Sequence, residues 1–456
     1  MTDRRFRLLS ATLFLFIFVS LSTAQPPYEL RPPAEFEPHE AMLIGWGYLG
    51  SYGSRADTMW ARAVEEIREV ADVYIVVPYS ANQTPITNFL TSLGISMDNV
   101  YFMVTTTMVS VWVRDYGPSF AYKENGVRVV LEGGYSNNFP HHVAGLWGLE
   151  HYHVPLNLQG GNYMTDGGRY ITISEAPVSQ EQFWDSTVRS YYDLPLHTLP
   201  KLQDEPCGHV DMYARFVAPG VVVMSEYSDP YYNNNLDAAA LELENRGYTV
   251  YRVPTPPVYN SRLPEDALAD PSKLHLPPGS KAPPGDRWDV FQTYTNGIQC
   301  NGKYLMPVYN HEFDDDAEAI FQMALPDHEI VPILATQIIL YGGALHCTSS
   351  DIAMPAPARP GNVGLSMSGS DVVLSWTGPP IGVTSYRVYK RINPLGFELD
   401  IDEYVAEVAG TNWTDENGLT GGDAVSYQIV SVNSNAVLSA FSEKIGGLDY
   451  TVDLNQ

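Results

Sequence analysis

Residues 42–46 read Met-Leu-Ile-Gly-Trp, and residues 73–77 read Val-Tyr-Ile-Val-Val. Both runs are short, apolar and bounded by turn residues, which is typical of buried strands. Residues 57–70 lie between them and read Asp-Thr-Met-Trp-Ala-Arg-Ala-Val-Glu-Glu-Ile-Arg-Glu-Val, with the spacing of an amphipathic helix. A strand, a helix and a second strand in this order predict an α/β domain.

The same order continues outward from this unit to about residue 355. Further apolar runs predict strands at Val127–Leu131, Tyr170–Ser174, Val221–Met224, Tyr248–Val253 and Tyr304–Val308. Amphipathic segments predict helices at Gln180–Tyr191, Leu236–Asn245 and Asp314–Ala324. The unit recurs five times at intervals of roughly 50–80 residues, a spacing compatible with five strand–helix modules around a common centre. We therefore assign residues 25–355 to one α/β domain.

The first residues have the pattern of a secretory signal peptide. Arg4-Arg5-Phe6-Arg7 precede an apolar stretch from Leu8 to Leu21, and the small residues Ser22-Thr23-Ala24 follow it. About 14 apolar residues are fewer than the ~20 that a membrane-spanning helix needs. We expect residues 1–24 to be removed and the protein to be exported without a membrane anchor, to the periplasm, the medium or the cell surface.

Two later segments depart from the α/β pattern. Residues 254–287 contain nine prolines and few apolar residues, which is typical either of a lid over a site or of a disordered insert. Residues 356–361 are rich in Pro and Ala and predict a stiff linker.

Residues 362–456 follow a different pattern, in which apolar and polar residues alternate. Alternation over Ser385–Lys390, Tyr404–Val408 and Val425–Val432 predicts a small all-β sandwich. With Trp376 and Tyr427 at their places along it, the segment resembles a fibronectin type III module. This resemblance implies a spacer or a binding platform, for which we expect an extracellular partner.

The charge balance narrows the classes of partner. The chain has 26 Lys and Arg against 53 Asp and Glu, a formal net charge of −27. Nucleic acid is excluded as a partner, because a phosphate backbone needs a basic face. A strongly acidic body instead attracts cationic substrates.

Three cysteines are present, Cys207, Cys300 and Cys347, and an odd number leaves at least one thiol outside any disulfide. Cys347 directly follows residues 342–346, Gly-Gly-Ala-Leu-His, where the glycines allow a tight turn and a close approach to a ligand. The thiol is either an exposed nucleophile at the tip of this turn or a buried structural cysteine. A switchable disulfide between Cys207 and Cys347 is a further hypothesis.

A nucleophilic thiol needs a proton shuttle, and Gly208-His209-Val210-Asp211 supplies a candidate. If this segment is extended, His209 and Asp211 project from the same face. The pair is then either a histidine held by a carboxylate or an acid/base group beside a carboxylate that binds a cation.

Three further polar motifs are candidates. Trp112-Val113-Arg114-Asp115-Tyr116-Gly117-Pro118 is expected to end a strand with Trp112 and Asp115 in a loop, although Arg114 and Asp115 could equally pair at the surface. Leu158-Gln159-Gly160-Gly161-Asn162 fits a glycine-rich hairpin or a site loop. Asn296 is a turn residue or a polar ligand.

Metal sites are weaker interpretations. His151 and His153 have no third ligand at a telling spacing, and Asp314-Asp315-Asp316 fits a helix N-terminus better than a calcium site. We expect no metal and no cofactor.

In their order along the chain, Trp112-x-x-Asp115-x-Gly117-Pro118, Gly160-Gly161-Asn162, Gly208-His209-Val210-Asp211 and Gly342-Gly343-x-x-His346-Cys347 resemble the motifs of the guanidino-group modifying enzymes. The resemblance is to the agmatine deiminases and the bacterial type of peptidylarginine deiminase. It implies a five-bladed α/β propeller of the pentein type, with the site at its centre.

The resemblance also implies roles for individual residues. Cys347 would be the nucleophile, His209 the acid/base, and Asp115 and Asp211 the ligands of the guanidinium. The site would further be lined by Trp112, Asn296, Gly161 and Asn162. Two carboxylates suit a guanidinium, which is planar, permanently charged and donates hydrogen bonds in a fork.

The expected reaction converts peptidyl-arginine to citrulline and ammonia through a covalent thiouronium-type intermediate. Export favours this substrate, yet residues 135–140, Tyr-Ser-Asn-Asn-Phe-Pro, lack the arginine pair with which the bacterial peptidylarginine deiminases hold a carboxylate. Gln159 likewise replaces a Glu of the agmatine deiminases. The alternatives are an agmatine deiminase that yields N-carbamoylputrescine, an amidinotransferase, and an exported binding protein without activity.

Overall fold

The computed structural model describes residues 30–47, 56–133, 138–175, 180–192, 194–260, 289–379, 381–393, 403–419 and 424–447. The expected signal peptide, most of the proline-rich segment 254–287 and residues 134–137 lie outside this set. Within it, no helix is both long and apolar enough to span a bilayer.

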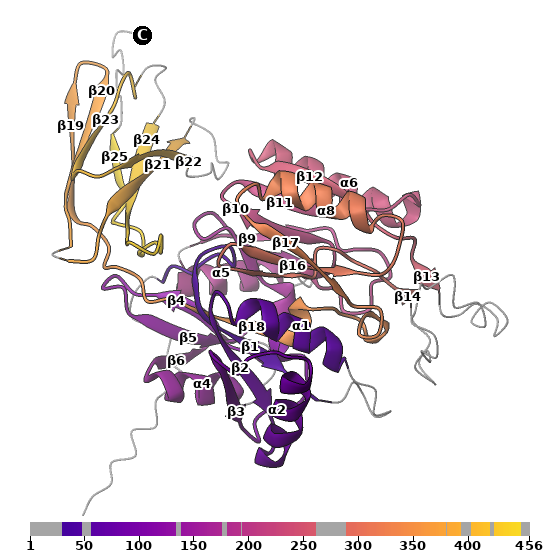
Figure 1. Ribbon diagram of the computed structural model, residues 1–456. Coiled ribbons are helices and arrows are strands. Elements are labelled where there is room, and N and C mark those ends of the chain that lie inside the picture. Colours follow the sequence, from indigo (N-terminus) through magenta and orange to yellow (C-terminus); the bar gives the residue numbers. More distant parts are fainter. Residues whose placement is uncertain are drawn as a thin grey trace, which may run out of the picture.

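The α/β domain is a set of small mixed sheets, and five of those among the described residues share one pattern. A central strand pairs antiparallel with one neighbour and parallel with the next, and a helix forms the parallel crossover. Figure 1 shows these sheets as neighbours, with α6 (Pro230–Asn245) and α8 (Asp314–Ala324) side by side over two of them. The mixed α/β class predicted from the sequence is therefore confirmed.

The elements of the second and third sheets are β4 (Ser119–Tyr122), β5 (Arg128–Glu132), α4 (Phe139–Trp147) and β6 (Glu150–His153), then β7 (Met164–Thr165), β8 (Ile171–Ser174), α5 (Glu181–Tyr192) and β9 (Leu196–Leu199). Those of the fourth and fifth are β10 (Ala214–Ala218), β11 (Val221–Glu226), α6 and β12 (Thr249–Pro254), then β15 (Ile298–Cys300), β16 (Lys303–Val308), α8 and β17 (Glu329–Leu334). Strands β13 (Tyr259–Asn260) and β14 (Asp289–Val290) form a separate pair.

The first sheet joins the two ends of the domain. Its order is β18 (Ser349–Ala353), β1 (His39–Gly45), β2 (Asp72–Val77) and β3 (Val100–Val104), with helices α1 (Asp57–Ile67) and α2 (Gln83–Ser92) in its crossovers. β1 pairs antiparallel with β18, so that His39 lies opposite Ala353. This sheet thus has the common pattern, but its antiparallel strand comes from the far end of the domain.

Helix boundaries follow local sequence signals. α1 buries Trp60, Val64 and Ile67, which recur at the spacing of one helical face. α8 begins and ends where the sequence predicts, and the Asp314 carboxylate accepts hydrogen bonds from the backbone N–H groups of Tyr309 and His311. Helix α6 begins six residues before the expected Leu236, because the Asp229 side chain caps its first turn and Pro230 follows.

The C-terminal residues form two antiparallel sheets, drawn in yellow and orange in Figure 1. Their strands are β19 (Gly361–Ser368), β20 (Asp371–Thr377) and β23 (Asn412–Asp415) in one sheet, and β22 (Glu403–Val408), β21 (Ser385–Asn393), β24 (Ala424–Val432) and β25 (Ile445–Gly447) in the other. One apolar cluster contains Trp376 and Leu374 from the first sheet and Val388 and Ile429 from the second. The fibronectin type III assignment stays a prediction.

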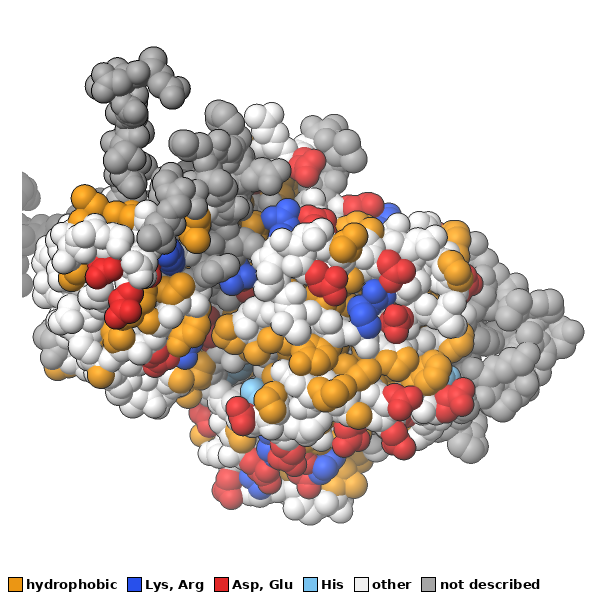
Figure 2. All heavy atoms as spheres, turned by 90° about the horizontal axis from the view of Figure 1, so that it is seen from above, with side chains coloured by type: hydrophobic (Ala, Val, Ile, Leu, Met, Phe, Trp, Pro, Cys, Tyr) orange, Lys and Arg blue, Asp and Glu red, His pale blue; other side chains and the backbone are white. Residues whose placement is uncertain are grey.

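The C-terminal segment also contacts the α/β domain directly. Val437 is fully buried in an apolar cluster with residues of β4, β5 and α4. Arg359, in the expected linker, forms an ion pair with Glu124 and donates a hydrogen bond to the Phe441 carbonyl. On the face shown in Figure 2, acidic side chains are spread widely over the surface, in keeping with the net charge of −27.

Candidate active site

Each of the five sheets contributes a segment at the same place, directly before its antiparallel edge strand. These segments are α3 (Val113–Tyr116) before β4, η3 (Gly160–Asn162) before β7, η4 (Val210–Met212) before β10, Asn296 before β15, and η7 (His346–Thr348) before β18. All of the residues predicted for the site lie in these segments or immediately beside them. The sheets therefore bring together motifs that are far apart in the sequence.

The Cys347 thiol is held by Asn296. The Asn296 side-chain amide donates to Cys347 Sγ at 3.2 Å, and its carbonyl oxygen accepts from the backbone N–H of Ala344 at 2.9 Å. Cys347 is only 4 % exposed, so of the two alternatives the exposed thiol at the tip of a turn is wrong and the buried thiol is confirmed. The residue lies instead in the 3-10 turn η7, packed against Gly343.

Asp211 links the thiol to a buried charged network. Its Oδ2 lies 3.6 Å from Cys347 Sγ and 2.7 Å from His346 Nδ1. His346 Nε2 lies 2.9 Å from Glu35 Oε2, so both ring nitrogens face carboxylate oxygens. Glu35 also accepts from Arg114 at 3.0 Å and from Arg215 at 2.7 Å.

The charges around Glu35 determine its protonation. Burial raises the pKa of this carboxyl group, but the neighbouring Arg114, His346 and Arg215 outweigh that effect and hold the pKa well below its usual range. Glu35 is therefore ionised at neutral pH. It fixes the orientation of His346, which in turn fixes Asp211.

Gly161 marks the point where the predicted residues meet. A methyl group on Gly161 would lie 2.5 Å from His209 Nδ1, 2.9 Å from Asp115 Oδ1 and 3.2 Å from Asp211 Oδ2. Only glycine leaves this space open. The expected extended segment is wrong, because Val210–Met212 forms the 3-10 turn η4, yet His209 and Asp211 still converge.

Each of the two carboxylates has one oxygen with an open acceptor position. Asp115 Oδ1 and Asp211 Oδ1 are buried and accept no hydrogen bond from any described residue, although His209 Nδ1 lies 3.6 Å from Asp115 Oδ1. Burial raises the pKa of Asp115 to about 6, an effect that the nearby His209 opposes and the charge of Asp211 reinforces. The site therefore offers negative acceptors to a cation that can donate hydrogen bonds.

Trp112 directly precedes the short helix α3 and Asp115 lies within it, so the strand expected to end here is absent from this described segment. Trp112 is half-buried, and its ring lies 3.1 Å from the place of a methyl group on Gly343, beside Cys347. Arg114 is buried and pairs with Glu35 and Asp351, which corrects the alternative of a surface ion pair.

Asn162 and Gln159 support the site from the third sheet. Asn162 Oδ1 accepts from the backbone N–H groups of Ser174 and Val210, so this side chain joins β8 to η4. Gln159 Oε1 lies 2.7 Å from His209 Nε2. Asn162 thus acts on the turn that carries the site, and Gln159 orients the imidazole.

All three cysteines are free thiols. Cys207 Sγ lies 3.4 Å from the Gly342 carbonyl oxygen, on the other side of the glycine pair from Cys347. Burial raises the pKa of the Cys207 thiol, and burial together with Asp211 and Asp115 raises that of the Cys347 thiol well above its usual range. Cys347 is not in a disulfide, which would have excluded nucleophilic chemistry.

Sequence reasoning missed Glu35 and Arg215 and gave Glu205 no role. Glu205 accepts hydrogen bonds from the backbone N–H groups of Cys207 and Gly208 and so holds the loop that leads to His209. No local pattern marks Glu35 or Arg215, because their roles arise from the packing of distant segments. Glu205 could have been found from the sequence, because it lies only four residues before His209.

Comparisons with known proteins identify the family of the chain. Residues 31–187 and 196–353 match the model of the Porphyromonas-type peptidyl-arginine deiminase family. A putative agmatine deiminase of Selenomonas ruminantium is 25% identical over 361 residues, covering 70% of this chain and 95% of that protein.

Solved structures show the same fold. The agmatine deiminase of Enterococcus faecalis superposes with a TM-score of 0.57 at 20% identity, covering 72% of this chain and 97% of that one. A putative arginine deiminase from Porphyromonas gingivalis gives a TM-score of 0.54 at 18% identity, covering 72% and 98%. With the family model matched over more than half of its length, the chain belongs to the Porphyromonas-type peptidyl-arginine deiminase family and is a guanidino-group deiminase.

Proposed function

We propose that the chain hydrolyses the guanidino group of a small cationic substrate, agmatine in the first place, to a ureido group and ammonia. The observation that carries this proposal is the pair of buried carboxylates Asp115 and Asp211, each with an oxygen that accepts no hydrogen bond from a described residue, of which Asp211 lies against the Cys347 thiol through its other oxygen. A guanidinium supplies both the positive charge and the fork of N–H donors that these oxygens lack.

The protonation of Cys347 fits a nucleophile that substrate binding activates. In the empty site Cys347 is protonated, because burial and two carboxylates disfavour the thiolate. A bound guanidinium neutralises the carboxylates and adds a positive charge beside the sulfur, which favours the thiolate. The nucleophile would then form only when substrate is present.

The reaction proceeds through a covalent adduct. The Cys347 proton passes to His209, the thiolate attacks the central guanidinium carbon, and a C–S bond forms as that carbon becomes tetrahedral. His209 donates a proton to a terminal nitrogen, the C–N bond breaks, and ammonia leaves a thiouronium group on Cys347. His209 then takes a proton from water, whose oxygen attacks the same carbon and releases the ureido product and the thiol.

Agmatine ranks before the peptidyl-arginine expected from export. The related proteins from Selenomonas ruminantium and Enterococcus faecalis are named as agmatine deiminases, putative in the first case. The site is also deep, since Cys347, Asp211 and Asn296 are all nearly fully buried, which suits a small substrate. Peptidyl-arginine is the second candidate, favoured by the description of the matched family.

The proposal extends to the arrangement of the domain and to its location. We place the five sheets around the site as blades of an α/β propeller, because each contributes its site segment from the same position. Export is proposed from the signal-like residues 1–24, and a β-sandwich of the fibronectin type III kind from the two C-terminal sheets.

An ammonia-release assay with agmatine, free arginine and an arginine-containing peptide tests the substrate. We expect agmatine to give the highest kcat/KM and Cys347→Ala to abolish turnover. Cys300→Ala, a buried thiol on β15, is the matched control and should remain active. Activity that survives Cys347→Ala would refute the mechanism, whereas a preference for the peptide would reverse only the order of substrates. Transfer of the amidino group to added glycine would instead support an amidinotransferase.

A further inference from the structure

A second cavity lies at the junction of the C-terminal sheets with the α/β domain. Its walls come from the segment before β1, the loop between β7 and β8, the turn between β10 and β11, the residues that follow α6, and from β21 and β22. The cavity volume is about 300 Å³. This lies at the lower end of the range of roughly 300–1,000 Å³ for small-molecule sites, which commonly lie between domains. None of the described residues that line it belongs to the active site.

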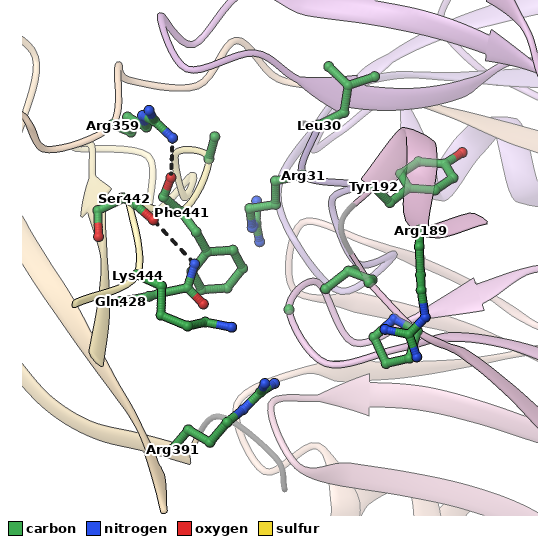
Figure 3. Close-up of a pocket in the computed structure, with 14 residues that line it drawn as sticks. Leu30, Arg31, Arg189, Tyr192, Arg359, Arg391, Gln428, Phe441, Ser442 and Lys444 are labelled. Atoms are coloured by element: carbon green, nitrogen blue, oxygen red, sulfur yellow. Dashed lines mark hydrogen bonds between the residues drawn. The ribbon is translucent and has the colours of Figure 1, made fainter. Parts of the chain in front are cut away.

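Arg31 holds the two sides of this junction together. It forms an ion pair with Glu37 and donates to the carbonyl oxygen of Leu438 in the C-terminal segment. Arg31 also lines a smaller neighbouring cavity, where Figure 3 shows it between the α/β domain and Phe441. The Phe441 ring packs against Tyr389 of β21, with the centroids 5.3 Å apart. The walls of the larger cavity are therefore fixed by contacts within the chain.

The charged groups of the larger cavity are balanced by their neighbours. Each of its three cations lies beside a carboxylate, in the pairs Arg31–Glu37, Arg169–Asp166 and Arg246–Glu242. The cavity therefore has no excess charge with which to select an ion of either sign, and we expect a neutral ligand.

Hydrogen-bonding capacity is nevertheless left over within these pairs. Glu37 Oε1 accepts from Arg31 and from the Ala34 N–H, but Glu37 Oε2 is buried and accepts no hydrogen bond from any described residue. Arg169 Nη1 is a buried donor that has no acceptor in the same set. Glu37 is only 5 % exposed. Because an unsatisfied buried acceptor or donor is costly, a ligand that serves both groups gains affinity.

The C-terminal sheets supply an aromatic wall. Tyr389 on β21 and Tyr404 on β22 line the cavity, with their ring centroids 6.1 Å apart. Tyr404 is 49 % exposed, so much of its ring is open to solvent. Phe36 lines the cavity from the α/β domain. Aromatic faces of this kind favour the C–H groups of a ligand over water.

A sugar ring matches this combination of groups. Each of its hydroxyls is both a donor and an acceptor, so that one hydroxyl can donate to Glu37 Oε2 while another accepts from Arg169 Nη1. Its C–H groups pack on aromatic rings, and it has no charge that would disturb the ion pairs. A metal ion or an oxyanion would satisfy only one of the two open groups.

We propose that this cavity binds a neutral saccharide, either a free monosaccharide or one unit of a polysaccharide. Glu37 and Arg169 bind its hydroxyls, and Tyr389 and Tyr404 contact its C–H groups. The proposal does not depend on the deiminase reaction, because none of these side chains takes part in it.

Calorimetric titration of the full chain tests the proposal. The probes are the methyl glycosides of glucose, galactose, mannose and N-acetylglucosamine, the polymers dextran and galactomannan, and free glutamine as a zwitterion. We expect saturable binding of at least one glycoside and no binding of glutamine. Tighter binding of a polymer than of its monosaccharide indicates a polysaccharide ligand, whereas equal or weaker binding of the polymer indicates a free sugar. Binding of no saccharide, or of glutamine alone, would overturn the proposal.

Matched variants locate the site. Tyr404→Ala and Arg169→Met should each weaken saccharide binding by about tenfold or more, because one removes an aromatic face and the other a buried donor. Tyr101→Ala is the control, because Tyr101 is also about half exposed, at 45 %, and packs on a neighbouring tyrosine of its own sheet. The midpoint of thermal unfolding without ligand shows whether each variant is folded.

A further variant separates this proposal from the deiminase reaction. Cys347→Ala should bind the saccharide as the wild type does, although it has no turnover. Unchanged affinity in both Tyr404→Ala and Arg169→Met, or an equal loss in Tyr101→Ala, would refute the site.

Discussion

Asp115 and Asp211 approach the same backbone point, Gly161. Because burial and the charge of Asp211 raise the pKa of Asp115 to about 6, its charge is lost as the pH falls through that value. We expect KM for a guanidinium substrate to rise as the pH is lowered from 7 to 5. In Asp115→Asn, KM should be high at every pH and this dependence should disappear. Steady-state kinetics over the range test this, and an unchanged pH dependence in the variant would contradict it.

At the level of single residues, sequence reasoning identified those that carry motifs. Cys347, His209, Asp211 and Asp115 were all predicted, and the structure brings them together around Gly161 and Gly343. Glu35 was not, because it stands before the first strand with no motif around it. Its role depends on Arg114, Arg215 and His346, which come from three other parts of the chain.

The short turn η3 is an element whose geometry tolerates only glycine. Gly161→Ala would place a methyl group against His209 and Asp115, so we expect kcat/KM to fall by about 100-fold or more, since a displacement of about 1 Å can cost that much. Gly145→Ala is the matched control, because nothing lies within 4 Å of its added methyl group on helix α4. The control should be fully active and more stable by roughly 0.5–1 kcal/mol. Circular dichroism would separate loss of activity from loss of fold.

Glu35 connects η7, α3 and β10, and its removal should act on stability. Glu35→Gln leaves Arg114 and Arg215 with less compensation, and breaking such a buried network costs about 3–5 kcal/mol. Glu65→Gln, an exposed residue that pairs only with Arg62 among the described residues, should cost roughly 0–1 kcal/mol. Urea unfolding at pH 7 measures both.

The pH dependence of this variant has a definite sign. Because the folded-state pKa of Glu35 is lowered, its contribution to stability is complete above the usual carboxyl range and is lost as the pH falls toward the lower folded value. The wild type should therefore lose more free energy of unfolding between pH 5 and pH 3 than Glu35→Gln does. Equal losses in the two proteins would show that Glu35 is not held as an ionised group.

Elements with periodicity were predictable and elements without it were not. The strands and helices that were predicted appear within a few residues of their expected positions, apart from the start of α6, because hydrophobic spacing marks them. The turns α3, η3, η4 and η7 are three or four residues long, too short to show a period. These turns carry the site, so its constituents could be predicted but its local geometry could not.

At the scale of the whole molecule, the C-terminal segment contributes to the core of the α/β domain. Val437 is fully buried in a cluster with Tyr122, Val130 and Phe139. We expect Val437→Ala to lower the free energy of unfolding by about 2 kcal/mol, through lost burial and a residual cavity. Val405→Ala, on the partly exposed β22, should have little effect. If thermal unfolding showed the two variants to be alike, the C-terminal segment would not be part of the domain core.

The sequence indicated five recurring modules but not that a strand from the end of the domain pairs with the first strand. The hydrophobic pattern indicates which residues are buried. It does not indicate which strand pairs with which, so the pairing of β1 with β18 could not be predicted from it. The contact of Val437 with the α/β domain was unpredictable for the same reason.

The pairing of β1 with β18 has a consequence for the order of events during synthesis. After β1 has been synthesised, the rest of the domain must still be translated before β18 emerges. The edge of β1 that pairs with β18 therefore stays unpaired during this time. Cys347 stands two residues before β18 and Glu35 four residues before β1. The pairing of β1 with β18 is therefore also the step that assembles the catalytic centre. A nascent chain released before this step would be prone to aggregation and would have no activity.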